Sequence, residues 1–263
     1  MIDAALLNWT LAQFLSMVVI MTRVGPLVFM MPILGSRSVP MQVKALFTLM
    51  TALVLVPVVQ VSPALLPETV LGFVLFVLRE VAFGAILSIF AQLVFLAMEM
   101  AGEMVGIQMG LGVVSVIDPQ FGGQISPIGQ FWNILAILIF LGMDGHHLYF
   151  RTLVESFAWV KPGGLHLSHA TYEGIMTGAG HMFTLAVKIM APATAALFFA
   201  QVAMGIIAKT VPQIPILIVG LPLNIGLGLL FVALSLGYFL PLMIQNFEML
   251  GHLLPKLAQG LGG

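Results

Sequence analysis

The sequence predicts an all-α, polytopic membrane-type protein with about six long, kinked helices and one amphipathic helix. Of the 263 residues, 60% are hydrophobic and only 7% are charged, whereas an ordinary soluble domain has roughly 25% charged residues. Apolar runs that reach the length needed to cross a bilayer, about 20 helical residues, recur along the whole chain. Prolines interrupt several of these runs, which predicts kinks within the helices.

Six apolar runs account for the predicted long helices. Segments with turn signals separate the first three runs, namely "PILGSRSVP" at Pro32–Pro40 and "SPALLPE" at Ser62–Glu68. The runs are Thr10–Met31, Lys44–Val61, Val70–Met98, Pro127–Met143, His181–Ala208 and Ile216–Ile244, with internal prolines at positions 26, 57, 192, 222 and 241.

Only the stretch from Asp144 to Gly180 is long and polar enough to lie outside a membrane. Within it, Arg151 and Glu155 share one side of a predicted helix. The opposite side carries apolar residues at the spacing i, i+3, i+4 and i+7, which is typical of an amphipathic helix at an interface or against a partner. These apolar residues are Phe150, Leu153, Val154 and Phe157.

The charge balance excludes one class of function. Nine Lys and Arg residues against ten Asp and Glu residues give a net charge of -1, so no basic surface is available to hold nucleic acid. The absence of cysteine excludes disulfides and thiolate chemistry. The Lys and Arg residues of the loops are divided evenly between the two sides, so the rule that positive loops stay inside predicts no orientation.

Charged residues within the apolar runs require partners. Arg79 and Glu80 lie in the third run and Lys188 in the fifth, and charges at membrane depth are costly unless they are paired. Adjacent residues on a helix point about 100° apart, so Arg79 and Glu80 cannot both face one narrow groove. Two alternatives remain open here, which are pairing within the chain and pairing with partner chains.

The stretch "MEMAGEMVGIQMGLG", Met98 to Gly112, is unusual within this chain. If it is helical, Gly102, Gly106 and Gly110 recur every four residues and form one face of small residues. Interior glycines weaken a helix, so either very close helix packing compensates for them or the segment is not a fixed helix. With flexible methionines beside them, these glycines suit either small-residue packing or a gate.

Histidines are the only candidates for a metal site or for catalysis. His146 and His147 are adjacent, and His166 and His169 could share a helical face. No metal-binding H-E-x-x-H, nucleophile G-x-S-x-G or phosphate-binding glycine motif is present. Because adjacent histidines point in different directions, we assign no metal, no cofactor and no catalytic residues from the sequence.

Four stretches, in order along the chain, resemble the FliR family of flagellar type III export gate proteins. They are "TRVGPLVFMMPILGSRSVPMQVK" (Thr22–Lys44), "GEMVGIQMGLGVVSVIDPQ" (Gly102–Gln120), "LGMDGHHLYFRTLVESFAWVKPG" (Leu141–Gly163) and "KTVPQIPILIVGLPLNIGLG" (Lys209–Gly228).

The resemblance implies a non-enzymatic subunit of the flagellar export gate. Members of the family assemble with FliP and FliQ, are associated with FlhB and the export platform, and pass unfolded proteins through the inner membrane at the flagellar basal body. It also implies a FliP-like portion over residues 1–175, fused to a FliQ-like helical hairpin over residues 176–263. No nucleic acid partner is implied.

The resemblance further implies two groups of functional residues. A loop at Met104–Phe121 would reach into the central channel as a plug, and polar residues would make contacts between subunits. The plug residues are Met104, Gly106, Met109, Gly110, Gly112, Asp118, Pro119 and Phe121, and the intersubunit contacts are Arg79, Glu80, Lys188, Gln213 and Asn224.

Two other classes of function compete with this expectation. Broken helices with intramembrane charges also suit a stand-alone secondary transporter or ion channel, in which Arg79, Glu99 and Glu103 would handle a proton or small ion. A membrane enzyme that uses His146 and His147 would need a bound metal.

Overall fold

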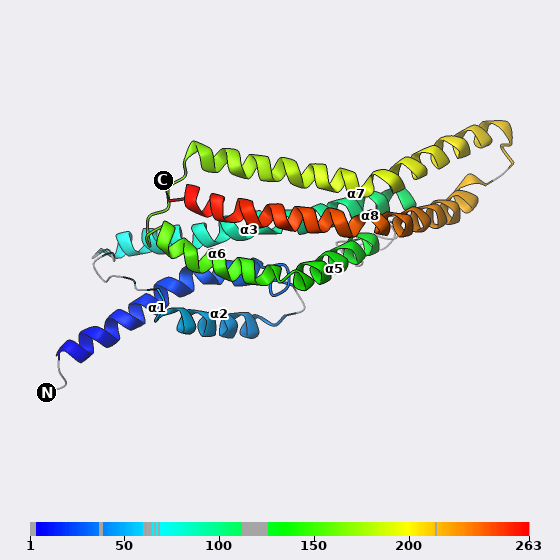
Figure 1. The fold of residues 1–263 in the computed structure, drawn as a ribbon. Helices are drawn as coiled ribbons and strands as arrows, with labels where there is room; N and C mark the ends of the chain where they lie inside the picture. The colour runs from blue at the N-terminus through cyan, green and yellow to red at the C-terminus, as the bar shows by residue number, and fades with distance from the viewer. Residues whose placement is uncertain are drawn as a thin grey trace. The chain divides into compact units, whose positions relative to one another are not determined.

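The fold is all-α, as the composition predicts. The structure is a computed structural model and describes residues 4–36, 39–59, 61, 65, 67, 69–111, 126–213 and 215–262. Within these residues every regular element is a helix (Figure 1). The helices are α1 Ala4–Met30, α2 Met41–Leu55, α3 Val70–Met109, α5 Pro127–Gly142, α6 Gly145–Trp159, α7 His169–Thr210 and α8 Ile216–Gly260.

Several helices extend beyond the apolar runs that predicted them; α1, for example, begins at Ala4 rather than Thr10. Helix α3 continues past Met98 to Met109, α7 begins at His169 rather than His181, and α8 continues past Ile244 to Gly260. In these three cases the predicted boundary was set by polar or glycine-rich sequence. The boundaries were wrong because packing against other helices stabilises turns that have weak intrinsic helix propensity.

Proline positions explain one shorter element. Helix α2 has 15 residues and ends at Leu55, two residues before Pro57. Val56 still has helical backbone angles, but Pro57 has no N–H with which to continue the helical hydrogen bonds. The predicted run Lys44–Val61 therefore does not form one continuous helix. By contrast, Pro26 and Pro192 lie inside α1 and α7, so these helices continue through their prolines.

Among the described residues, four helices are long and apolar enough to cross a membrane. They are the segments Ala12–Met30, Val70–Met109, Thr171–Thr210 and Ile218–Gly260, and a fifth span is counted if the consecutive helices α5 and α6 are taken together. In the most apolar segment of α7, only 17% is buried within the chain. In the corresponding segment of α8, 28% is buried. These helices therefore leave most of their apolar surface available to lipid or to other chains.

The amphipathic helix is α6, but its buried face differs slightly from the predicted one. Leu153 is buried as expected, while Phe150, Val154 and Phe157 are only partly buried. Arg151 and Glu155 form the expected exposed pair, with 2.8 Å between Nε and Oε1. The buried stripe is turned by about one residue, because α6 also buries small polar groups that form hydrogen bonds inside the chain; it consists of Tyr149, Thr152, Leu153 and Ser156.

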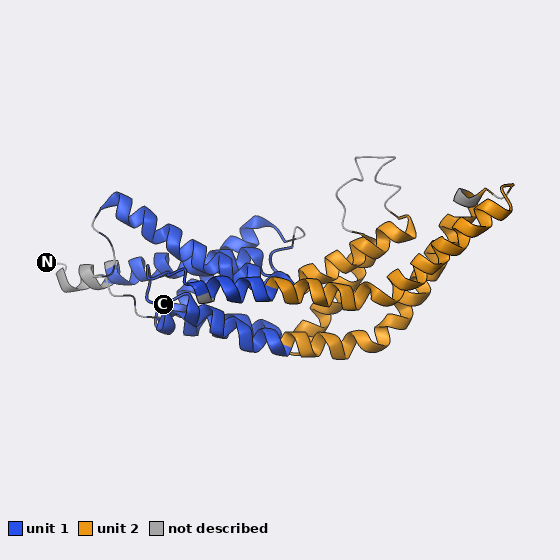
Figure 2. Cartoon of the chain, turned by 90° about the horizontal axis from the view of Figure 1, so that it is seen from above, with its two compact units in different colours: residues 1–93, 144–178, 248–263 blue, residues 94–143, 179–247 orange. Residues whose placement is uncertain are grey.

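The described chain divides into two compact units (Figure 2). Unit 1 contains residues 1–93, 144–178 and 248–263, and unit 2 contains residues 94–143 and 179–247. Each unit therefore includes residues from both sides of the expected boundary between positions 175 and 176. In unit 2, the rings of Phe95, Phe140 and Phe247 contact one another with centroids 5.2–5.6 Å apart.

Helices α7 and α8 pair as an antiparallel hairpin within each unit. In unit 2, the hydroxyl of Tyr238 on α8 donates a hydrogen bond to the carbonyl of Ile189 on α7 at 3.0 Å. In unit 1, the hydroxyl of Thr171 on α7 donates to the carbonyl of Gly260 on α8 at 2.9 Å. A hydrogen bond in each unit thus holds the two helices in register.

Candidate functional site

The predicted plug segment is described at its two ends. Met104, Gly106, Met109 and Gly110 lie in the last turns of α3, and the chain is described again from Ser126, just before α5. The remaining four predicted plug residues lie outside the described residues; they are Gly112, Asp118, Pro119 and Phe121.

Helix α3 is regular through the methionine- and glycine-rich stretch and ends at a defined cap. Gly110 has a φ of 84°. Its N–H donates to the carbonyl of Ile107 at 3.0 Å, and the N–H of Leu111 donates to the carbonyl of Gly106 at 3.0 Å. These two bonds and the left-handed glycine form a Schellman motif. Glycine adopts this φ without strain, whereas a residue with a Cβ would be strained. Gly110 is therefore suited to end the helix.

Gly102 and Gly106, the other two glycines of the Met98–Gly112 stretch, allow close packing of α3 against α5. A Cβ on Gly102 would overlap the backbone N and Cα of Gly129, and a Cβ on Gly106 would overlap the hydroxyl of Ser126. Backbone contact at this distance leaves no room for a side chain. Of the two readings of the sequence, very close helix packing is therefore the one that the structure of this stretch supports.

The end of α3 also packs against α8 within unit 2. Met109 is fully buried, and a Cβ on Gly228 would lie 2.5 Å from its Cγ. A Cβ on Gly110 would lie 2.7 Å from Cδ1 of Leu221. Met104, by contrast, is 40% exposed. The helix end is thus anchored by Met109 and Gly110, while Met104 stays accessible.

The carboxylates of Glu99 and Glu103 bind α5 and its N-cap residue. Glu99 Oε1 accepts a hydrogen bond from the amide of Asn133 at 3.1 Å. Glu103 Oε2 accepts one from the backbone N–H of Ser126, the N-cap residue of α5, at 3.3 Å. Both acidic side chains therefore have structural partners on a neighbouring helix, and this arrangement gives no specific support to an ion-transporting role.

Unit 1 contains a buried charged cluster around Arg23 that was not predicted from the sequence. Arg23 on α1 is fully buried and donates two hydrogen bonds to Glu80 on α3, from Nε to Oε2 at 2.7 Å and from Nη2 to Oε1 at 3.1 Å. Oε1 of Glu80 also accepts the N–H of Gly163 at 2.7 Å. The contact expected between subunits for Glu80 is therefore made inside the chain.

The rest of the Arg23 guanidinium is enclosed by α6 and its following turn. Nη1 donates to the carbonyls of Ser156 and Val160, both at 3.1 Å. The rings of Phe83 and Phe157 lie on the guanidinium with centroids 4.4 and 4.2 Å from Cζ. One residue thus ties α1, α3 and α6 together. The signal in the sequence was a lone arginine inside the first apolar run.

The remaining polar residues expected at intersubunit contacts are mostly exposed. Arg79 is exposed, and its Nη1 donates at 3.2 Å to the carbonyl of Gly163, the residue whose N–H binds Glu80. Lys188 and Gln213 are exposed on unit 2. Asn224 is half-buried, and its Oδ1 has no hydrogen-bond partner among the described residues.

Comparison with known proteins gives one family. The profile of the family described as "Bacterial export proteins, family 1" matches residues 14–250. The chain is similar to the flagellar biosynthetic protein FliR of Bacillus subtilis (strain 168), with 28% identity over 88% of this chain and 90% of that protein. It is also similar to the proteins of the same name from Pectobacterium carotovorum, with 26% identity over 96% of both chains, and Escherichia coli (strain K12), with 27% identity over 91% of both chains.

Proposed function

The chain belongs to the family of bacterial export proteins, family 1, and is a membrane-embedded FliR-type component of the flagellar export apparatus; on this premise we propose that it is a subunit of the type III export gate. In this proposal it assembles with FliP-like and FliQ-like chains in the inner membrane at the basal body. The complex associates with FlhB and the export platform and conducts unfolded flagellar proteins. The observation that carries the proposal is the family match over residues 14–250.

The surfaces of α7 and α8 support assembly with similar chains. These helices pair as a hairpin yet leave most of their apolar surface uncovered by the rest of the chain. A FliQ-like hairpin over residues 176–263, beside a FliP-like portion over residues 1–175, would present such faces to neighbouring subunits. Lys188, Gln213 and Asn224 would supply polar contacts among them, because buried amides and amines need hydrogen-bond partners.

Assembly is tested by purifying the full chain with an affinity tag from its own membranes in a mild detergent. Quantitative mass spectrometry should find FliP-like and FliQ-like chains in fixed ratio to it. With Arg79→Glu, which reverses the charge of an exposed side chain on α3, we expect roughly tenfold less of the partner chains, equivalent to about 1.4 kcal/mol of binding energy.

The matched control for this variant is Arg79→Lys, which keeps the charge and should keep the partners. A chain that purifies alone, as a monomer or homodimer, would contradict the export-gate proposal. Full recovery of both partners with Arg79→Glu would contradict only the role of Arg79.

We also propose that the segment from Met104 to Phe121 closes the channel of the complex. The described end of this segment supports the proposal, because Met109 and Gly110 fix the helix end while Met104 remains accessible. Unbranched methionines can pack around an irregular opening and yield to a passing chain.

Deletion of residues 110–115 should make cells leaky to ions, because it removes the helix cap and part of the proposed plug. The measurement is the inward leak of a monovalent cation in cells that express the variant. The same deletion in cells without the FliP-like partner should cause no leak, since the pore belongs to the complex. Membranes that stay tight although the complex assembles would refute the plug.

A further inference from the structure

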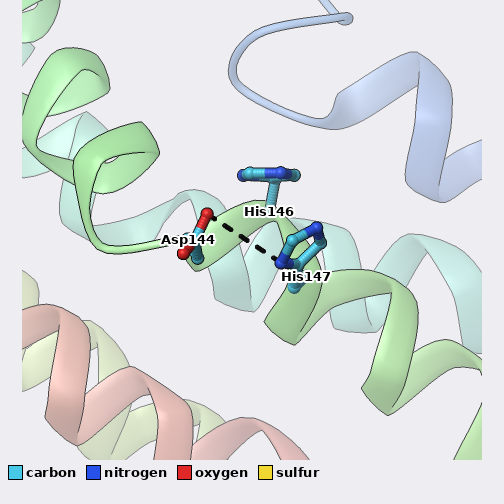
Figure 3. Close-up of side chains that lie close together, drawn as sticks. All are labelled: Asp144, His146 and His147. Atoms are coloured by element: carbon cyan, nitrogen blue, oxygen red, sulfur yellow. Dashed lines mark ion pairs between the residues drawn. The ribbon is translucent and has the colours of Figure 1, made fainter.

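We propose that Asp144, His146 and His147 form a binding site for a divalent transition-metal ion, with zinc as the ion of first choice. One ligand atom from each residue lies within 4.8 Å of the others, and these three residues are the one such group among the described residues. Figure 3 shows the carboxylate and the two imidazoles around the start of α6. The site is independent of the export function proposed above.

The local backbone brings these three residues together. Asp144 has a φ of 55° and is the residue immediately before α6. This left-handed conformation, which Asp tolerates better than most residues, places Asp144 beside the first turn of α6. The histidines occupy the second and third positions of that helix. The metal-site candidates in the sequence were histidines alone, and Asp144 was not predicted as a third ligand.

The carboxylate of Asp144 is available to a metal ion. Asp at a helix N-cap usually accepts a backbone N–H from the first turn, but the side chain of Asp144 makes no such bond. Its Oδ1 lies 3.9 Å from Nδ1 of His147, which is too long for a hydrogen bond. A bridging ion would allow both atoms to be satisfied at normal ligand distances.

The imidazoles are also suited to bind a shared ion. Nδ1 of His146 is shielded from solvent and has no hydrogen-bond partner among the described residues. The two rings lie close together, with centroids 4.2 Å apart and an angle of 46° between their planes. The two imidazoles of this first turn therefore lie close enough to share one ion.

The ligand set indicates the class of metal. Two imidazole nitrogens and one carboxylate oxygen suit zinc and neighbouring transition metals better than magnesium or calcium, which prefer oxygen ligands. Three protein ligands leave a fourth tetrahedral position open for water or for a group from another chain. Asp144 and His147 are largely exposed, with 74% and 72% of their side-chain surface accessible, so an ion can enter without unfolding. Once bound, it would brace the first turn of α6.

Direct titration tests the site. The full chain, purified in detergent with a tag that contains no histidine and freed of metal with a chelator, is titrated with zinc chloride by calorimetry. We expect one zinc ion per chain, and at least about tenfold weaker binding in His147→Ala and Asp144→Asn. The control is His252→Ala, an exposed histidine of unit 1 outside the cluster, which should bind zinc like the original chain.

Two further readouts separate a specific site from weak surface binding. Zinc should raise the thermal unfolding midpoint of the original chain but not that of Asp144→Asn, because only a ligand that binds the folded state stabilises it. Cobalt(II) in place of zinc should give the visible absorption of tetrahedral coordination. Absence of one-to-one binding, or equal binding by the original chain and both variants, would overturn the proposal.

Discussion

Replacement of Arg23 by alanine is expected to reduce the free energy of unfolding by about 3–5 kcal/mol, the usual cost of removing one partner of a buried ion pair. Arg23 and Glu80 are both buried, and the guanidinium also holds the carbonyls of Ser156 and Val160. The substitution leaves the charge of Glu80 without its main partner and frees two buried carbonyls. The thermal unfolding midpoint in a mild detergent, followed by tryptophan fluorescence, should fall by roughly 10 °C.

The chain supplies its own control for this experiment. Arg151 and Glu155 form an ion pair of the same chemistry at a similar distance, 2.8 Å, but 77% of the Arg151 side chain is exposed. Arg151→Ala should therefore leave the thermal unfolding midpoint almost unchanged, because water screens an exposed ion pair. The double variant Arg23→Met with Glu80→Met should recover part of the stability lost in Arg23→Ala, because it removes both buried charges and fills the space. Similar small effects of Arg23→Ala and Arg151→Ala would show that the buried cluster does not hold unit 1 together.

Replacement of Gly102 by alanine should destabilise unit 2 by about 2–3 kcal/mol, the upper part of the usual range for overpacking. The new Cβ would overlap the backbone of Gly129, and a backbone cannot move aside as a flexible side chain can. Helices α3 and α5 would have to separate, which would also strain the hydrogen bond between Glu99 and Asn133. Thermal unfolding in detergent again measures the effect.

The matched control for Gly102 is Gly237, an exposed glycine within α8 where an added Cβ would meet no other atom within 4 Å. Gly237→Ala should be neutral or stabilising by up to about 1 kcal/mol, because alanine has the higher helix propensity. The two substitutions are chemically identical and should differ in sign. Stabilisation by both would mean that α3 and α5 do not pack at Gly102.

Several features of the fold and of the site could be predicted from the sequence. The exposed Arg151–Glu155 pair followed from helical spacing, and Gly102 and Gly106 share the side of α3 that meets α5, as expected. The expectation was wrong for Gly110, which ends the helix and meets Leu221 of α8. The different environments of Arg79 and Glu80 also followed from the sequence, because adjacent residues on a helix point about 100° apart. Glu80 is buried and Arg79 is exposed. These are local properties, which depend on the repeat of the helix rather than on the partners it meets.

Contacts between distant residues could not be predicted. Arg23 and Glu80 are 57 positions apart, and Arg23 and Ser156 are 133 apart. Nothing in the spacing of one run indicates which other run supplies its partner. The sequence therefore left pairing within the chain and pairing between chains as alternatives for Glu80, and only the packing of α1 against α3 and α6 placed its partner.

By itself, the sequence determined the all-α class, the membrane-type composition and the family. Hydrophobic content, helical spacing and the order of motifs depend only on the order of residues along the chain. The tertiary structure alone decided which glycines meet a backbone and which carboxylate Arg23 binds. These outcomes depend on atoms that meet only when the chain folds, and the free energy of such contacts depends on burial and on the partner available in space.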